Sequence, residues 1–162
     1  MSKVTRAQDD GRTLRAYFDR ILVRCQRCDA RATVRSIESA HPVEERPFGT
    51  FRLQCESCAH CAEMAPNAYA ILNAVGGKLV DPFFRAPLLL QTDTRLGTVF
   101  AYNEQHLDWL ERFVSADLRE RTHLDGRANA SMASRLPRWM KLAKNRDAIL
   151  QAIGKLQAEL TG

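Results

Sequence analysis

Two Cys-x-x-Cys pairs are the residues of this chain best suited to chemistry. Cys25 and Cys28 form the first pair, Cys55 and Cys58 form the second, and 26 residues lie between Cys28 and Cys55. Each pair can wrap two thiolates around one metal ion, and two pairs complete the tetrahedral shell of a structural zinc site. The spacing therefore predicts one Zn²⁺ ion held by four cysteine thiolates.

A shell of four cysteines leaves no open position on the metal. Catalytic zinc usually has three protein ligands and one water, so this shell predicts a structural ion whose binding energy, on the order of 10 kcal/mol, is folding energy. Four thiolates and one Zn²⁺ sum to a charge of −2, which nearby cations can compensate. The candidate cations are Arg24, Arg27, Arg31 and Arg52.

Cys61 and His60 leave a second set of ligands open. Cys61 lies three residues beyond Cys58, so these two cysteines also have the spacing of a pair. We favour Cys55 and Cys58 because an alternating strand leads directly into Cys55, as a metal-binding knuckle requires. Cys61 is then a small apolar residue or a free thiol.

A disulfide framework is the competing interpretation of the five cysteines. The first ten residues contain no apolar segment, so they do not resemble a secretory signal. A reducing cytoplasm keeps thiols available for metal, and cysteines in pairs are typical of metal sites. We therefore expect a cytoplasmic metalloprotein.

Composition restricts the class of protein further. The chain has 162 residues, of which 45% are hydrophobic and 27% charged, as in one ordinary globular domain or two small ones. No run approaches the roughly 18 apolar residues of a membrane helix, so no membrane partner is expected. The net charge of +5 is compatible with nucleic acid without requiring it.

The elements around the cysteines follow from hydrophobic spacing. A helical pattern begins at Arg12 and continues to Leu22. Residues 32–38 and 50–54 alternate and are predicted strands, and a loop at 41–49 with two prolines and a glycine separates them. The order is knuckle, strand, loop, strand, knuckle.

In this order and spacing, the segment from Cys25 to Cys58 resembles the zinc-ribbon superfamily, found in transcription factors, ribosomal proteins, topoisomerases and replication proteins. The resemblance implies short antiparallel strands around a structural zinc ion. Zinc ribbons often have glycine after the second cysteine of a knuckle, where a left-handed backbone is required, but this chain has Asp29 and Ala59. Aspartate tolerates that conformation and alanine does so poorly, which leaves the geometry of the second knuckle open.

The whole chain is similar to a small, uncharacterised bacterial family that follows such a ribbon with three further motifs. These motifs are Asp81-Pro82-Phe83-Phe84 with Pro87-Leu88-Leu89-Leu90-Gln91-Thr92, then Ala101-Tyr102-Asn103-Glu104-Gln105-His106-Leu107, and finally Ser134-Arg135-Leu136-Pro137-Arg138-Trp139-Met140-Lys141 with Ala143-Lys144-Asn145-Arg146. This resemblance implies an architecture and no activity.

The rest of the chain predicts a hairpin and helices. Residues 66–75 are either a short helix stopped by Gly76-Gly77 or partly a third ribbon strand. Strands at 88–92 and 98–102 predict a hairpin, and Asn103 is a natural N-cap for the next helix. That helix is expected to bury Leu107, Leu110, Val114 and Leu118, with Trp109 and Phe113 beside them. Residues 122–129 are a linker, and Asn145 is expected to cap a last helix with Ile149, Ile153, Leu156 and Leu160 on one face.

The predicted fold class is thus α+β, with an N-terminal zinc ribbon of short antiparallel strands, a β-hairpin and C-terminal helices. Four segments are predicted. They are a helical lead-in at 1–20, the ribbon at 21–64, a hairpin-plus-helix body at 65–126 and a basic helical segment at 127–162.

The C-terminal segment carries much of the positive charge. Between Arg119 and Asp147 there are eight Lys or Arg residues and three acids, a difference of +5 (8 − 3). In a helix, its cations would share one side and its apolar residues would face inward, so this side could neutralise phosphates or could simply be solvated. The cations are Arg135, Arg138, Lys141 and Lys144, and the inward residues are Leu136, Trp139, Met140 and Ala143.

No motif indicates catalysis or a small-molecule substrate. The chain has no Gly-rich phosphate loop, no His-Glu-x-x-His and no nucleophile elbow, so we expect it not to be an enzyme. The first predicted function is nucleic-acid binding by Arg135, Arg138, Lys141 and Lys144, with Arg27 and Arg52 beside the zinc. The alternative is a protein-interaction adaptor, inhibitor or immunity-type protein whose zinc only stabilises a binding surface.

Overall fold

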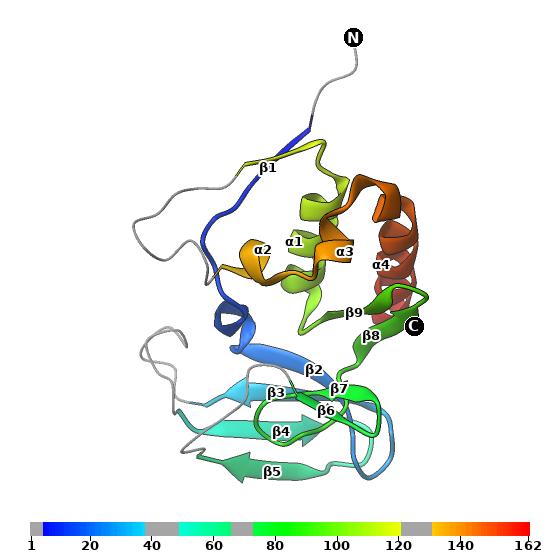
Figure 1. The fold of residues 1–162 in the computed structure, drawn as a ribbon. Helices are drawn as coiled ribbons and strands as arrows, with labels where there is room; N and C mark the ends of the chain where they lie inside the picture. The colour runs from blue at the N-terminus through cyan, green and yellow to red at the C-terminus, as the bar shows by residue number, and fades with distance from the viewer. Residues whose placement is uncertain (1–4, 38–48, 66–72, 121–130) are drawn as a thin grey trace. The chain divides into compact units, whose positions relative to one another are not determined.

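A computed structural model describes residues 5–37, 49–65, 73–120 and 131–162 of the chain (Figure 1). The fold is mixed, with one four-stranded antiparallel sheet, several strand pairs and helices toward the C-terminus. The strands are β1 (Arg6–Gln8), β2 (Arg20–Arg24), β3 (Arg31–Ser36), β4 (Phe51–Cys55), β5 (Cys61–Met64), β6 (Asn73–Val75), β7 (Lys78–Val80), β8 (Leu90–Thr94), β9 (Gly97–Ala101) and β10 (Leu118–Glu120). The α-helices are α1 (Glu104–Ser115), α2 (Met132–Arg135), α3 (Arg138–Lys141) and α4 (Arg146–Thr161).

The chain forms two compact units, each of which is described by itself. The cysteine unit comprises residues 15–91 and 100–103. The helical unit comprises residues 1–14, 92–99 and 104–162. The four predicted segments with their boundaries stay a prediction.

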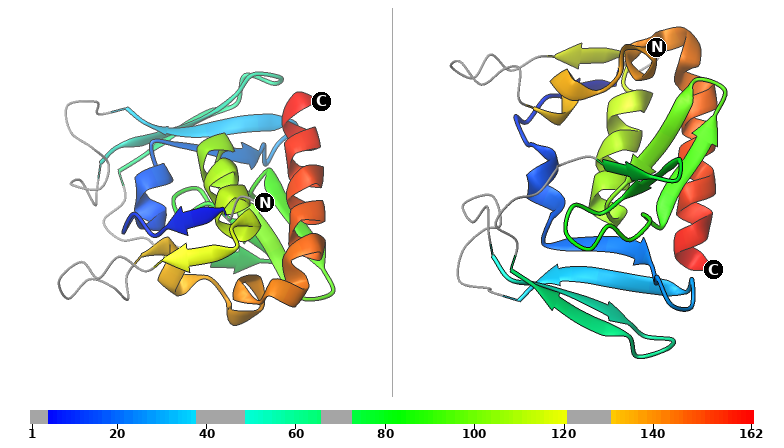
Figure 2. Two further views of the ribbon diagram at one scale, coloured as in Figure 1. Left: turned by 90° about the horizontal axis from the view of Figure 1, so that it is seen from above. Right: turned by 60° about the horizontal axis from the view of Figure 1, so that its bottom comes forward.

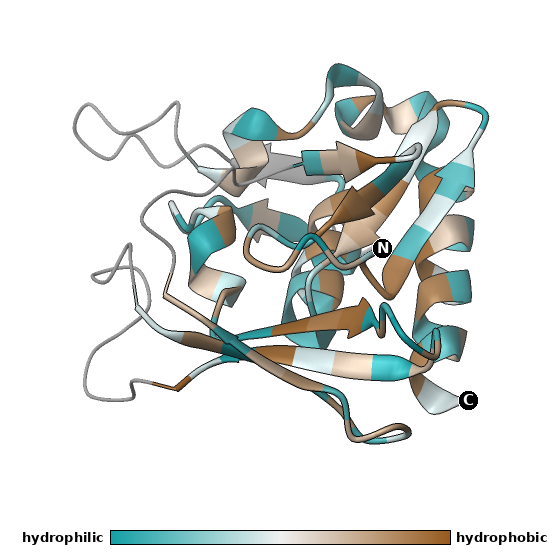
Figure 3. Cartoon of the chain, turned by 90° about the horizontal axis from the view of Figure 1, so that it is seen from below, coloured by the Kyte–Doolittle hydropathy of each residue, from teal (hydrophilic) through white to brown (hydrophobic). Residues whose placement is uncertain are grey.

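The four-stranded sheet of the cysteine unit has the order β2-β3-β4-β5, and all neighbours are antiparallel. In β4 every second residue is buried, which places Phe51, Leu53 and Cys55 on one face. The middle of β2, Ile21-Leu22-Val23, is instead a continuous apolar run, and this strand is mostly brown in Figure 3. The strands predicted at 32–38 and 50–54 are confirmed as β3, which ends at Ser36, and as β4, and β5 adds a further strand to the same sheet.

The helix predicted from Arg12 to Leu22 is wrong. A single 3-10 turn covers Leu14–Tyr17, and the chain is a strand from Arg20. The reason is non-local, because β2 is hydrogen-bonded along both edges. One edge pairs with β3, and on the other the N–H of Leu22 donates to the carbonyl of Tyr102 at 2.7 Å. The N–H of Leu89 in turn donates to the carbonyl of Leu22 at 3.0 Å. Both backbone groups of Leu22 are therefore bonded to distant segments, which stabilises a strand at this position.

Aromatic rings fill the core of the cysteine unit. Phe51 of β4 stacks on Phe83 with ring centroids 3.6 Å apart. Phe18 meets Phe83 and Tyr102 edge-on, with centroids 5.4 Å and 5.7 Å away. These four rings are buried, and the stacked pair joins β4, the strand before the second cysteine pair, to the loop at 81–86.

Gly76 and Gly77 form the turn of a hairpin between β6 and β7. Both have positive φ, 57° and 78°, which explains two consecutive glycines there. The helix predicted at 66–75 is therefore wrong for 73–75, and its part at 66–72 lies outside the described residues. The hairpin predicted at 88–102 is confirmed as β8 and β9.

In the helical unit, α1 and α4 lie side by side in both views of Figure 2. The expected apolar faces are buried in both helices, except that Leu160 near the end of α4 is only partly buried, and Trp109 stacks on Phe113 with centroids 5.2 Å apart. Leu118 departs from the prediction, because it belongs to β10, which pairs in parallel with β1. The linker predicted at 122–129 lies outside the described residues.

The basic C-terminal segment is not one continuous helix. Two one-turn helices, α2 and α3, are separated by Leu136 and Pro137, because proline cannot continue a helix. Trp139 packs inward over Gly97, where an added Cβ would lie 2.9 Å from the indole. Asn145 stands before α4, but its side-chain amide donates to the carbonyl of Trp139 at 2.9 Å and does not cap the helix. Ala143 is exposed, contrary to expectation.

None of the helices in the described segments has the length and apolar character needed to cross a membrane.

Candidate metal centre

The four predicted ligands come together in the cysteine unit. Cys25 directly follows β2, and Cys55 is the last residue of β4. Cys28 and Cys58 lie in the turns that follow, so each pair supplies one buried and one exposed cysteine. These four are the one such cluster of His, Cys, Asp and Glu among the residues that the structure describes.

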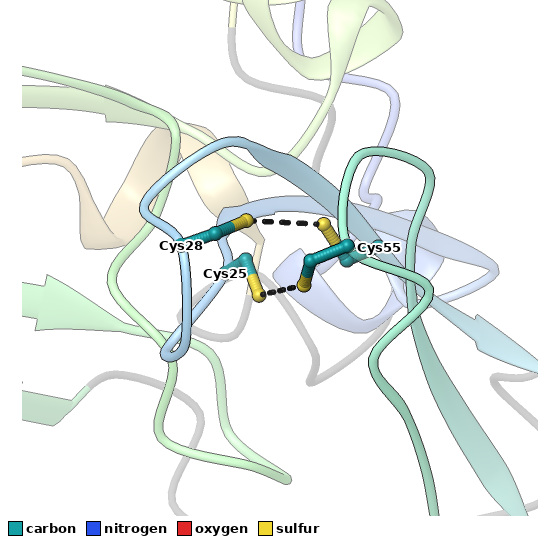
Figure 4. A group of neighbouring side chains, drawn as sticks. Cys25, Cys28 and Cys55 are labelled. Carbon is teal, nitrogen blue, oxygen red and sulfur yellow. Dashed lines mark hydrogen bonds between the residues drawn. The ribbon is translucent and has the colours of Figure 1, made fainter.

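Sulfur distances fit a tetrahedral ion and do not fit a disulfide. The Sγ atoms of Cys25 and Cys58 are 3.6 Å apart, as are those of Cys28 and Cys55. All four sulfurs lie within 4.8 Å of one another, and Figure 4 shows them turned toward a common centre. Zn–S bonds of about 2.3 Å at tetrahedral angles place sulfurs about 3.8 Å apart, whereas a disulfide is about 2.05 Å long. The group can therefore hold one metal ion.

Both knuckles have the same backbone geometry. Asp29 and Ala59, the residues after the second cysteine of each pair, are left-handed with φ of 60° and 56°. The N–H of Cys25 donates to the carbonyl of Ala30 at 2.8 Å, and the N–H of Cys55 donates to that of His60 at 2.9 Å. The second knuckle thus closes like the first, although alanine disfavours this conformation.

Cys61 and His60 do not join the cluster. Cys61 is paired with Gln54 in the β4–β5 register. Since neighbouring residues of a strand point to opposite faces, the position beside Gln54 faces away from Cys55. The carbonyl of His60 closes the second knuckle, so its backbone supports the site.

Hydrogen bonds and burial give the two thiols of the first pair different pKa values when no ion is bound. The pKa of Cys25 is lowered to about 7, first because the backbone N–H of Arg27 donates to its sulfur, at 3.4 Å. The N–H of Ala30 also favours the thiolate of Cys28. That effect is outweighed by the neighbouring sulfurs, Cys58 first, and by burial, which together raise the pKa of Cys28 to about 12. Within the first pair, Cys25 therefore offers a thiolate to an incoming cation more readily than Cys28.

The arginines expected to compensate the thiolate charge differ in their partners. The guanidinium of Arg24 reaches the first knuckle and donates to the carbonyl of Asp29 at 3.4 Å. Arg27 and Arg31 have exposed side chains. Arg52 instead forms an ion pair with Glu63 of β5 at 2.6 Å.

Asp81 and Gln26 support the first knuckle, and neither residue was predicted from the sequence to do so. Asp81 is fully buried and accepts hydrogen bonds from the backbone N–H groups of Phe83, Phe84 and Ala86, at 2.7–2.9 Å. The loop that it folds offers the carbonyl of Phe84 to the side-chain amide of Gln26 at 3.2 Å. The Asp-Pro dipeptide signals the turn, but nothing in the sequence indicates that this turn meets the metal knuckle.

The predicted nucleic-acid residues fall in both units. Arg27 is at the exposed end of the first knuckle, and Arg52 lies on β4 of the same unit. In the helical unit, Lys141 is partly buried and donates to the carbonyl of Ser134 at 2.7 Å. The remaining three, Arg135, Arg138 and Lys144, are exposed.

Comparison with protein-family models, with curated proteins and with solved structures finds no match for this chain. The cysteine cluster is consistent with a zinc-ribbon-like metal site, while membership of that superfamily and of the bacterial family stays a prediction.

Proposed function

We propose that this protein is a structural-zinc protein that binds nucleic acid and has no catalytic role of its own. The observation that carries the proposal is the closed set of four thiols, with the exposed Arg27 and Arg31 next to these cysteines in the chain. Four sulfur ligands select zinc among the common divalent ions of cells and leave no coordination position for a substrate.

The structural role follows from what the cysteines join. Cys25 directly follows β2, and Cys55 ends β4. An ion held by both would cross-link strands that are 30 residues apart in the chain (55 − 25). The metal would therefore stabilise the sheet directly, and its binding energy would appear as folding energy.

Support for nucleic acid comes from the chemistry of the exposed cations. Arginine is suited to phosphate because its planar guanidinium donates two parallel hydrogen bonds. Arg27 stands exposed at the knuckle, and Arg135 and Arg138 are exposed in the helical unit. Binding through such residues should be independent of sequence and should weaken steeply with salt.

Fluorescence anisotropy with labelled oligonucleotides tests the proposal. Zinc-loaded protein is titrated into mixed-sequence duplex and single-stranded DNA and RNA at 50 and 200 mM salt. We expect micromolar or tighter binding at the lower salt and a linear fall of log K with log salt. Native mass spectrometry of the same sample should show one zinc ion per chain, and no binding to any oligonucleotide at 50 mM salt would refute the nucleic-acid role.

The alternative is a protein-binding module stabilised by zinc. It is favoured by three apolar side chains of the cysteine unit that are exposed, Ile37, Met64 and Val75. This class predicts a stoichiometric protein partner that survives nuclease treatment. Substituting these three residues with serine should then abolish that complex without changing the zinc content.

A further inference from the structure

Three arginines of the four-stranded sheet lie directly opposite one another. The register pairs Arg20 of β2 with Arg35 of β3, and Arg35 with Arg52 of β4. Directly opposite residues on neighbouring strands project from the same face. These three side chains, named here the arginine row, therefore cross the sheet on the face opposite to Leu53 and Cys55.

More positive charge lies on the same face. Arg24 and Arg31 are also paired, and they lie four residues along their strands from the arginine row. The one acid that the registers of β2 to β5 place on this face is Glu63, opposite Arg52. Five arginines and one glutamate give the face a formal charge of +4 (5 − 1).

This arrangement opposes the stability of the sheet itself. Like charges directly opposite each other destabilise a strand pair, and here two consecutive pairs are arginine against arginine. The ion pair between Arg52 and Glu63 relieves the end of the row at β4, and it is exposed, with 44% and 51% of the side chains accessible. An exposed pair of this kind contributes little, so Arg52, and Arg35 opposite it, can still bind an added anion.

The surface beside the row is hollowed. A depression of about 320 Å³ is lined by the cations Arg35 and Arg52, the acid Glu56, and the uncharged residues Thr33, Ser36, Ile37 and Gln54. Arg35, Arg52 and Gln54 are exposed, so their donors are accessible from solvent. A phosphate group is small enough to enter such a depression and accepts hydrogen bonds from both guanidinium groups.

We propose that the arginine row is the contact surface for the phosphate backbone of double-stranded nucleic acid. This proposal rests on the proposed function and specifies its binding surface and ligand. Strands about 4.8 Å apart place Arg20 and Arg52 about 10 Å apart. That length corresponds to about three base-pair steps of a duplex, at 3.4 Å of axial rise each, so the row can contact more than one phosphate. The registers place no aromatic residue on this face, so it lacks the stacking platform typical of single-strand binders.

The test compares matched variants in duplex binding across a salt series. Arg35→Gln with Arg52→Gln should lower the slope of log K against log salt by about 2, close to 1 for each phosphate that is no longer neutralised. Glu63→Gln should strengthen binding about two- to fivefold, because it removes the competing anion. Arg95→Gln, which changes an exposed arginine in the β8–β9 turn, is the control and should change neither.

Zinc content and far-UV circular dichroism identify any variant that fails to fold, and the gain expected for Glu63→Gln cannot arise from misfolding. If the unmodified protein, the double variant and Glu63→Gln all bind duplex with the same affinity and the same salt dependence, that result refutes the role of the arginine row and leaves the proposed function intact. If Arg138→Gln with Lys144→Gln removes the salt dependence instead, the contact surface is the C-terminal segment. Tighter binding to single strands than to duplex would also overturn the proposal, and absence of all binding would overturn both.

Discussion

Replacing Ala59 with glycine should stabilise the protein, against the usual effect of glycine. Ala59 has φ of 56°, a left-handed conformation that places its Cβ against the backbone. That conformation costs roughly 1–2 kcal/mol for a residue with a side chain. Glycine avoids this cost, but its greater freedom in the unfolded chain offsets about 0.5–1 kcal/mol. The expected net gain is about 0.5–1 kcal/mol.

Thermal unfolding of zinc-loaded protein at a fixed free zinc concentration measures this gain, because bound metal itself shifts the midpoint. For a chain of this size, the gain corresponds to a Tm increase of about 1–4 °C. Ala62→Gly in β5 is the matched control, and it should lower the Tm because glycine weakens a strand. Asp29→Gly should give a smaller gain than Ala59→Gly, since aspartate tolerates φ near 60°. A decrease for Ala59→Gly as large as that for Ala62→Gly would refute the left-handed geometry of the second knuckle.

Three further predictions concern metal, a buried carboxylate and pH. Cys55→Ser should abolish stoichiometric zinc binding and cooperative unfolding, whereas Cys61→Ser should retain both, as measured by elemental analysis and circular dichroism. Asp81→Asn should cost about 1–3 kcal/mol in urea unfolding, because the amide NH₂ cannot accept the backbone N–H groups, while the exposed Asp108→Asn should be neutral. Burial lowers the pKa of His106 to about 3, so the stability it contributes is complete above the unfolded pKa near 6.5 and is lost as pH falls toward 3. His106→Gln should therefore flatten the acid side of the stability profile, and an unchanged profile would contradict the burial of a neutral imidazole.

The metal cluster was predictable because each half of it is encoded in a short stretch of sequence. Two Cys-x-x-Cys pairs, each beside a strand, need only the correct register to meet, and the alternation in Phe51–Cys55 supplies that register. Spacing alone left Cys61 as a possible partner of Cys58, and the alternating strand that leads into Cys55 favoured Cys55 instead. Local periodicity likewise identified α1, α4 and the β8–β9 hairpin.

The errors fall where distant segments override local patterns. Tyr17, Phe18, Ile21 and Leu22 have helical spacing, but Leu22 hydrogen-bonds to residues 89 and 102, which no local window contains. The opposition of Arg35 and Arg52 was equally hidden, because it depends on how β3 and β4 align across 17 positions of the chain (52 − 35). In the C-terminal segment, the one or two helical turns expected before Pro137 are present as α2, but the separate α3 after the proline leaves no continuous basic helix face.

The two-sided pairing of β2 bears on attempts to study the cysteine-rich part alone. A fragment ending soon after Met64 would lose residues 87–89 and 102, and the second edge of β2 would be left without its backbone partners. Open edges of this kind recruit strands from other molecules, and here the exposed strand would be the apolar run Ile21-Leu22-Val23. Aggregation of such a truncated fragment would thus reflect where the chain was cut, even with all four thiolates and their ion intact. A fragment meant to remain monomeric should extend through Asn103.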